Sequence, residues 1–365
     1  MQLGFVTPRY GHAQGGLGNS AARVHAHLAS AHDVTVFELC PELPPRTLRA
    51  LSANHVQIAS SGENKYAMQF LVDVLGPHAH EMLCGFYAGP TAFPLWLAAQ
   101  LMGSKLVLFA RGNDVDLEPF GSEGAKIVHA WQRADRVVCV TRELERKITA
   151  WAPGARTIYV PNGIDVDAFT HGAPPPTDAA DERLRIGIFG ELKSKKGLER
   201  LLVELEPARC SLRIVGSLRP DTEKLLHGML TLDPALAKSV THVPFVTTRE
   251  ALLAEYAEVD VVCIPSLHEG MSNVMLEAMA LGKLLVASRV GGALDALVHE
   301  QNALTFEALE DGALAAALRR AQQVDRGALG AAARTTVRTH YSAALERTRT
   351  LDALRSLDPL AGCDV

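Results

Sequence analysis

Two glutamates eight residues apart are the feature of this sequence that most clearly suggests chemistry. Glu269 and Gly270 follow the apolar run 261–265, and Glu277 lies further on in a stretch with a helical pattern. Gly270 permits a tight turn, after which the N–H groups of residues 271–273 open the helix and favour an anion. About two helical turns separate the glutamates, so they need not contact the same ligand group. Taken alone, Glu277 is also consistent with a solvated acid on a helix surface.

A basic loop follows a second apolar run. Lys193, Lys195 and Lys196 stand between the run 184–189 and a helical stretch that begins near Leu198. Ammonium groups and helix N–H groups in this position suit a diphosphate, and they stabilise the charge that a leaving phosphate gathers. A run of solvated lysines would have the same composition, so the loop alone does not decide between these interpretations.

A glycine cluster, Gly15-Gly16-Leu17-Gly18, follows the first apolar run and opens a helix. Glycines here let backbone N–H groups approach an anion at the start of a helix, although a mere tight turn would need them equally. The spacing is not that of the dinucleotide-binding fingerprint, and the chain has no nucleoside-triphosphate-binding loop motif.

These segments need elements that place each of them at the end of a strand. Short apolar runs alternate with amphipathic stretches, which predicts parallel sheets covered by helices on both faces. The proline-rich stretch 173–181 interrupts this pattern and predicts a connection between two doubly wound domains facing across a cleft. Residues 309–357 are helical in pattern, with a break near His340. The expected strands are residues 3–7, 34–39, 56–59, 82–86, 106–110, 137–141 and 157–160, then 184–189, 212–215, 242–245, 261–265 and 284–287.

The bulk composition excludes several classes of protein. Of the 365 residues, 48% are hydrophobic and 21% are charged, with a net charge of −5, which argues against a nucleic-acid-binding protein. This charge gives no polybasic patch for a membrane surface, but a mildly acidic total does not exclude a local one, so peripheral membrane contact stays open. The chain runs from Met1 straight into an apolar strand and has no run of 18 apolar residues, which predicts a cytoplasmic protein. The six cysteines show no paired spacing and are expected to be small buried residues in a reducing compartment.

Taken together, these segments resemble the family 4 glycosyltransferases, which have the GT-B fold of two Rossmann-like domains. The resemblance covers nearly the whole chain, and the combination of Pro161-Asn162-Gly163-Ile164-Asp165 with the two spaced glutamates is specific to it. It implies an acceptor-binding domain at 1–165, a donor-binding domain at 166–340 and a C-terminal helix within 341–365 that packs on the first domain.

The resemblance also implies a role for each site residue. The donor is a nucleotide sugar: Glu269 contacts the sugar hydroxyls, Glu277 the ribose hydroxyls and Lys196 the diphosphate, while segment 242–247 places the base. Catalytic roles fall on Glu269, Lys196 and Arg111. The other donor contacts expected are Gly16, Gly18, Lys193, Gly216, Val246, Gly270, Met271, Ser272 and Asn273, with the glycine loop closing over the phosphates.

Two positions depart from the usual pattern of the family. Glu191 stands where many members have an arginine that pairs with the diphosphate, so Lys196 must carry more of that charge, with Lys193 or Lys195 as substitutes. Arg111 stands where a histidine often contacts the donor sugar; arginine still donates hydrogen bonds but is never neutral. Other members pair such an arginine with Gly-Glu-Leu, which indicates a subgroup.

The family transfers sugars with retention of anomeric configuration and needs neither a metal nor a cofactor. The leaving phosphate takes the proton of the acceptor, and the protein stabilises that phosphate and positions the hydroxyl. The acceptor is a sugar, a lipid-linked molecule or a small molecule facing loops 60–66 and 113–121, with Asp114 or Asp116 as candidates to orient it. His12 and His268 are further candidates for ligand contact.

Family frequency favours a UDP-sugar over GDP-mannose. A sugar-nucleotide-binding protein without turnover, and a GT-B epimerase or phosphorylase, are the alternatives.

Overall fold

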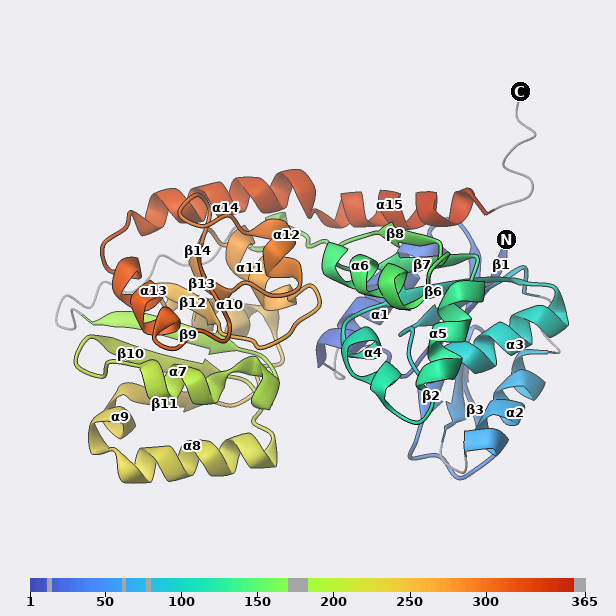
Figure 1. Ribbon diagram of the computed structural model, residues 1–365, viewed down its shortest axis with the longest axis horizontal. Coiled ribbons are helices and arrows are strands. Elements are labelled where there is room, and N and C mark those ends of the chain that lie inside the picture. The colour runs from blue at the N-terminus through green and yellow to red at the C-terminus, as the bar shows by residue number, and fades with distance from the viewer. Residues whose placement is uncertain (12–14, 61–63, 77–79, 170–182, 358–365) are drawn as a thin grey trace. The chain divides into compact units, whose positions relative to one another are not determined.

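The computed structural model describes residues 1–11, 15–60, 64–76, 80–169 and 183–357. It divides into two compact units, the first formed by Met1–Asn162 with the chain from Ala344 onward, and the second by Gly163–Ala343 (Figure 1). Each unit contains one sheet with helices packed on it, so the prediction of two parallel α/β sheets is confirmed. The proline-rich connection 173–181 and Cys363 lie outside the described residues. No helix among the described residues is both long enough and apolar enough to cross a membrane.

The first sheet has eight strands in the order β3-β4-β2-β1-β5-β6-β7-β8. Its inner strands are almost entirely buried, which explains their continuous apolar sequences. All neighbours pair in parallel except β3 and β4. The strands are β1 (Gln2–Thr7), β2 (Asp33–Cys40), β3 (Leu48–Ser52), β4 (His55–Ala59), β5 (Met82–Phe86), β6 (Lys105–Ala110), β7 (Arg136–Cys139) and β8 (Thr157–Tyr159).

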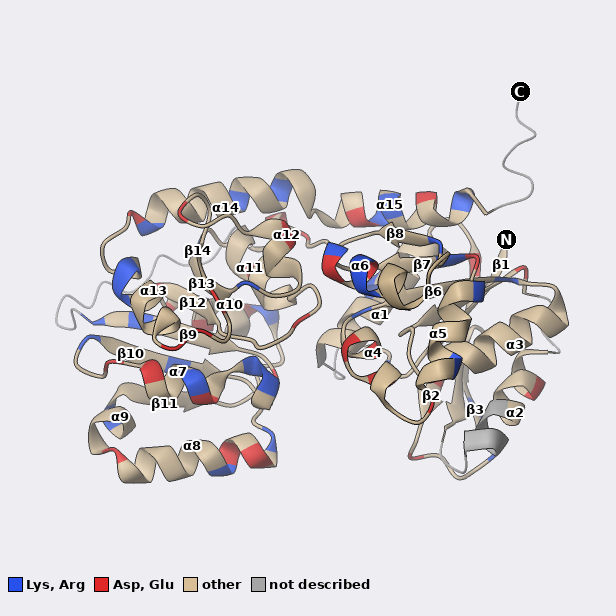
Figure 2. Ribbon diagram, viewed as in Figure 1, with Lys and Arg blue, Asp and Glu red and all other residues tan. Residues whose placement is uncertain are grey.

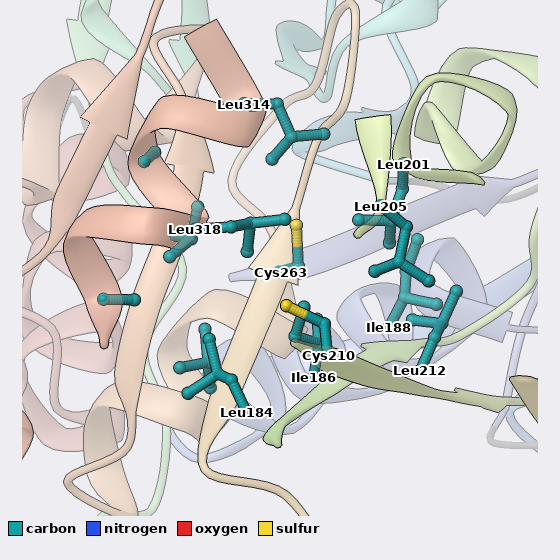
Figure 3. Close-up of a cluster of buried hydrophobic side chains, with 14 of the residues drawn as sticks. Leu184, Ile186, Ile188, Leu201, Leu205, Cys210, Leu212, Cys263, Leu314 and Leu318 are labelled. Atoms are coloured by element: carbon teal, nitrogen blue, oxygen red, sulfur yellow. The ribbon is translucent and has the colours of Figure 1, made fainter. Parts of the chain in front are cut away.

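The second sheet has six strands in the order β11-β10-β9-β12-β13-β14, all parallel. Alternate residues of β9 face a core formed with helices α7 (Leu198–Glu204), α8 (Pro220–Leu232), α9 (Pro234–Ser239) and α13 (Ala313–Ala321). Figure 3 shows part of this core, with Ile186, Cys210 and Leu318. The opposite face of β9 carries Phe189. The strands are β9 (Leu184–Phe189), β10 (Cys210–Val215), β11 (Val240–Val243), β12 (Val261–Ile264), β13 (Leu284–Ser288) and β14 (Leu304–Phe306).

Helices connect the strands in both units. In the first unit they are α1 (Gly15–Ala29), α2 (Asn64–Leu75), α3 (Ala92–Met102), α4 (Asn113–Asp116), α5 (Gly124–Arg133), α6 (Arg142–Trp151) and α15 (Ala343–Arg355), with the 3-10 turn η2 (Glu118–Phe120). In the second unit they are α7 (Leu198–Glu204), α8 (Pro220–Leu232), α9 (Pro234–Ser239), α10 (Arg249–Ala257), α11 (Asn273–Ala280), α12 (Gly292–Ala296), α13 (Ala313–Ala321) and α14 (Arg326–His340), with turns η3 (Asp167–Phe169) and η4 (Ser194–Lys196).

Three elements differ from the expectations. β3 is an exposed edge strand that pairs antiparallel with β4, so the first sheet is not wholly parallel; its residues are all exposed and therefore gave no apolar run. β11 begins and ends two residues earlier than predicted, and it ends directly before Pro244, which lacks the N–H that would continue the ladder. The glycine cluster, a loop by the resemblance, forms the first turn of the helix that it was expected to open, because α1 begins at Gly15.

Helix α15 packs on the first unit through both apolar and charged contacts. Ala353 and Leu354 belong to the core of the first sheet. Glu346, only 2% exposed, lies 2.6 Å from Arg23 Nε and 3.4 Å from His27 Nε2, both on α1. Burial raises the pKa of Glu346, but Arg23 and His27 outweigh it and hold the pKa below its ordinary value. The buried ion pair therefore ties α15 to α1.

We predict that Glu346→Ala destabilises the first unit by about 3–5 kcal/mol, because it leaves the Arg23 guanidinium in a partly buried place without its partner. All three tryptophans, Trp96, Trp131 and Trp151, belong to the first unit, so urea unfolding followed by tryptophan fluorescence measures this unit. Arg355→Ala is the control: it removes an exposed pair with Asp352 on the same helix and should cost less than about 1 kcal/mol. Equal losses in the two variants would contradict the role of the buried pair.

Candidate functional site

The carboxyl ends of β9 and β12 form the topological switch point of the second sheet. β9 and β12 are neighbours in the sheet. The chain passes from β9 to β10 on one side and from β12 to β13 on the other, so the connections after β9 and β12 leave in opposite directions. In open α/β sheets a crevice forms where two such connections diverge, and ligands bind there. The connection after β9 holds the basic loop, and the connection after β12 holds Glu269. The topology thus brings the two strongest predicted segments together.

Lys196 and Glu269 form an ion pair at this point. Lys196 Nζ lies 2.5 Å from Glu269 Oε2, and Ser266 Oγ donates a longer hydrogen bond of 3.4 Å to the same oxygen. Only 19% of the lysine side chain and 16% of the glutamate side chain are exposed. Burial raises the pKa of Glu269, but Lys196 and Lys195 outweigh it, so the pKa lies below its ordinary value. A cation and a carboxylate therefore stand side by side in a partly dehydrated place, where charges act strongly on a ligand.

Close backbone approaches fix the two loops. Gly197 has φ 72°, and a Cβ there would lie 1.9 Å from Pro265 O. Gly291 has φ 52°, and a Cβ there would lie 1.9 Å from Glu269 O. Only glycine combines this backbone conformation with room for such contacts. Substitution at either position would displace the turn that carries Glu269.

The turn into α11 contains four of the predicted donor contacts. Ser272 is the N-cap of this helix, and its Oγ accepts the N–H of Met275 at 3.4 Å. Gly270 O accepts the N–H of Gly292 at 3.0 Å, which fixes the turn from the other side. The first N–H groups of a helix point along its axis and attract anions. The four residues in the turn are Gly270, Met271, Ser272 and Asn273.

Glu277 lies further along α11 and is paired with a residue that the sequence did not single out. Tyr256 Oη, on α10, donates a hydrogen bond of 2.7 Å to Glu277 Oε2. The tyrosine ring stacks on Phe189 with a centroid distance of 4.1 Å. The two partners are 21 residues apart on different helices, so no sequence spacing could indicate the contact.

Glu191, the acid that replaces an arginine of the family, is held between two cations. Its Oε2 lies 3.2 Å from Lys193 Nζ, and its Oε1 lies 3.4 Å from Arg219 Nε. Figure 2 shows basic and acidic residues side by side where β9 and β10 end, with lysines in η4 and acids in the first turns of α7 and α8. Arg219 was not predicted; its only sequence signal is its position shortly after β10. Lys193 and Arg219 therefore offset the negative charge of Glu191.

The segment predicted to place the base begins within β11. His242 Nε2 donates to Gly216 O at 2.9 Å, which joins this segment to the end of β10. Gly216 has φ 135°, and a Cβ there would lie 2.0 Å from Gly190 O. Val246 lies half-buried in the turn that follows β11. Val215 O accepts the N–H of Gly190 and Val243 O accepts the N–H of Gly216, both at 2.9 Å, so backbone hydrogen bonds join the ends of β9, β10 and β11.

The remaining predicted site residues belong to the first unit. Gly16 and Gly18 lie in the first turn of α1, where Gly18 O accepts the N–H of Gly11 at 3.3 Å. Arg111 follows β6: its Nη2 donates to Asn162 Oδ1, and its guanidinium lies 4.8 Å from the ring centroid of Phe86. Burial lowers the pKa of Arg111 to about 10, so it remains a cation at neutral pH.

The expectation that Asp114 orients an acceptor hydroxyl is wrong. Its side chain is fully buried, and its carboxylate accepts the N–H groups of Ala88, Arg111 and Gly112 at 2.6–3.0 Å. Asp114 instead holds the backbone around Arg111 in place. Asp116, the other candidate, forms an ion pair of 2.7 Å with Lys147.

Of the two histidine candidates, the structure describes only His268. His268 lies half-buried in the turn before Glu269. His12 lies outside the described residues, as do residues 61–63 of the expected acceptor loop.

Within the described ranges, no group of three or more His, Cys, Asp or Glu side chains is arranged to hold a metal ion. The five described cysteines are buried and free.

We predict that Asp114 makes the stability of the first unit depend on pH. Burial raises the pKa of Asp114 from 3.8 to about 6, despite the three N–H donors that act against it. The folded unit therefore binds this proton more tightly than the unfolded chain does. The stabilisation is complete below about pH 4 and is lost as the pH rises through 6, a change of up to about 3 kcal/mol.

Tryptophan fluorescence during urea unfolding at pH 4.5 and pH 7.5 tests this expectation in wild type and Asp114→Asn. The asparagine keeps an oxygen for the N–H donors but does not titrate, so wild type should lose stability relative to the variant between these pH values. Asp352→Asn, at a side chain that is 55% exposed, is the control. A wild-type advantage or deficit that stays constant over this range would argue against the proton on Asp114.

Comparison with known proteins matches both units to glycosyltransferases. Residues 14–168 match the family described as Glycosyltransferase Family 4, and residues 183–323 match the family described as Glycosyl transferases group 1. A lipopolysaccharide core biosynthesis glycosyltransferase of Rhizobium meliloti is 31% identical over 218 residues, which cover 56% of this chain and 59% of the relative. A D-inositol 3-phosphate glycosyltransferase of Geodermatophilus obscurus is 29% identical over 248 residues, covering 60% and 51%. The chain thus spans between about half and three fifths of the length of these relatives.

Solved structures of low sequence identity have the same fold. Sucrose-phosphate synthase from Thermosynechococcus elongatus superposes with a TM-score of 0.79 at 19% identity, covering 98% of both chains. The Anabaena protein HepE, solved in complex with UDP-glucose, superposes with a TM-score of 0.78 at 17% identity, covering 98% of this chain and all of the other. These superpositions show the GT-B fold, and the sequence matches of both units show that the chain belongs to the family 4 glycosyltransferases.

Proposed function

We propose that the chain is a retaining glycosyltransferase that moves a sugar from a UDP-sugar to an acceptor hydroxyl. The observation that carries the proposal is the ion pair between Lys196 and Glu269 at the switch point of the second sheet, directly before α11. A transferase needs a cation for the diphosphate and an acceptor of hydrogen bonds for the sugar hydroxyls, placed next to each other. Both groups are present here, together with the first N–H groups of a helix.

Catalysis of this reaction depends mainly on electrostatic stabilisation by the protein. As the bond between the sugar and the β-phosphate breaks, negative charge accumulates on the phosphate, and Lys196 and the α11 amides stabilise it. The phosphate accepts the proton of the acceptor hydroxyl on the same face of the sugar, which retains the anomeric configuration. Glu269 binds sugar hydroxyls and holds the reacting carbon in position. Arg111, a cation at neutral pH, is the further hydrogen-bond donor that this proposal assigns to the substrate.

The bound ligands of similar proteins guide the choice of substrates to test. HepE was solved with UDP-glucose, whereas a relative in Mycolicibacterium smegmatis, 27% identical over 266 residues, is described as a GDP-mannose-dependent phosphatidylinositol monomannoside mannosyltransferase. We favour a UDP-sugar as the donor and a hydroxylated small molecule or lipid headgroup as the acceptor.

The test is turnover by the purified chain with UDP-glucose or GDP-mannose. Release of the nucleoside diphosphate is measured without acceptor and with monosaccharides, inositol phosphate or phosphatidylinositol, and products are identified by mass spectrometry. We expect Glu269→Ala and Lys196→Ala to lower turnover by roughly 100-fold or more, because each removes a group that stabilises the transition state. Both variants should remain folded in thermal unfolding.

Matched controls are Glu258→Ala and Lys238→Ala, which remove exposed side chains of the same types from the same unit. They should turn over at the wild-type rate. Wild-type activity in Glu269→Ala and Lys196→Ala would refute the site. Donor binding by wild type with neither transfer nor hydrolysis would instead identify a sugar-nucleotide-binding protein.

A further inference from the structure

We propose that Tyr256 is a positioning residue of the donor site, acting through its hydrogen bond to Glu277. The inference rests on the proposed function, in which Glu277 binds the ribose hydroxyls of the nucleotide. Tyr256 would set the direction of the Glu277 carboxylate before the nucleotide arrives. Its hydroxyl would thereby contribute to nucleotide affinity without contacting the nucleotide.

The tyrosine is built into the second unit from two sides. It is 1% exposed, and its ring lies nearly parallel to that of Phe189, with an angle of 17° between the rings. Phe189 is itself 4% exposed and is the last residue of β9. The ring position is therefore fixed by the strand whose following loop carries Lys196. Such a ring can hold its hydroxyl at one place with little freedom.

The hydroxyl makes a short hydrogen bond to a charged group. Its distance of 2.7 Å to Glu277 Oε2 is typical of an O–H donating to a carboxylate. Burial, and then the charge of Glu277, raise the pKa of Tyr256 well above its ordinary value, so the hydroxyl keeps its proton and donates a hydrogen bond. Glu277 is only partly buried, whereas Tyr256 is not accessible to a ligand. The carboxylate is thus the group that meets the nucleotide.

A fixed carboxylate binds ribose more tightly than a rotating one. Glutamate has several rotatable bonds, and the freedom lost on binding opposes affinity unless the side chain is already held in place. The hydrogen bond from Tyr256 removes part of that freedom in the unbound protein. Its loss should weaken nucleotide binding while leaving the sugar and diphosphate contacts of Glu269 and Lys196 intact.

Tyr256→Phe tests the hydroxyl alone, because the phenylalanine keeps the ring and its stacking on Phe189. Calorimetric titration of wild type with UDP and GDP first identifies the tighter nucleotide, which is then compared with its 2′-deoxy form. We expect Tyr256→Phe to bind the ribose form roughly 10-fold more weakly and to discriminate less against the 2′-deoxy form. In turnover, KM for the donor should rise while kcat stays near the wild-type value.

Tyr341→Phe is the matched control. Tyr341 is also a buried tyrosine of the second unit, and its hydroxyl donates to Asp295 O at 2.9 Å. This variant loses a comparable hydrogen bond and should keep both the affinity and the discrimination of wild type. Thermal unfolding of both variants shows whether Tyr256→Phe loses more stability than the loss of one such hydrogen bond causes in Tyr341→Phe.

Glu277→Ala and the double variant Tyr256→Phe/Glu277→Ala separate the inference from the proposed function. If Tyr256 acts through Glu277, the double variant binds no more weakly than Glu277→Ala. A Glu277→Ala variant that binds as wild type, or a wild type that binds neither UDP nor GDP, refutes the donor site and the inference with it. Weak binding by Glu277→Ala together with wild-type binding and discrimination by Tyr256→Phe overturns the inference alone.

Discussion

The site depends on the parallel pairing of β9 with β12. These strands are adjacent in the sheet, but the chain leaves them in opposite directions, so their loops diverge and leave room for a ligand. Lys196 comes from the first loop and Glu269 from the second, and they meet at 2.5 Å. A change in this pairing would separate the cation from the carboxylate, whatever the local structure of either loop.

Strand β9 also supports the other end of the site. Its last residue, Phe189, lies under the ring of Tyr256, and the hydroxyl of Tyr256 contacts Glu277. One strand therefore positions both the group expected at the diphosphate and, through two further side chains, the group expected at the ribose. The glycines at 197, 216 and 291 complete this arrangement, since a side chain at any of them would collide with a neighbouring backbone oxygen.

The predictable parts of the fold are those whose residues are buried on both faces. Strands such as β5 and β13 have continuous apolar sequences because helices or core side chains cover them on each side, and the sequence placed them within one residue. The exposed strand β3 has no such sequence, and it forms only because β4 offers hydrogen bonds beside it. Asp114 was wrongly expected to face the acceptor, because an acid in a loop is usually exposed to solvent. Here three backbone N–H groups donate hydrogen bonds to its carboxylate and allow it to be buried.

The sequence by itself determined the family and the two α/β units, and it singled out Glu269, Glu277 and Lys196 as candidate donor contacts, because these features depend on local patterns of burial, turns and spacing. Only the tertiary structure decided which side chains act together. The contacts of Glu269 with Lys196, Glu277 with Tyr256, and Glu191 with Arg219 each join different elements. Such partners are set by the order of strands in the sheet and by the packing of helices on it. Neither the strand order nor the helix packing produces a periodic pattern in the sequence.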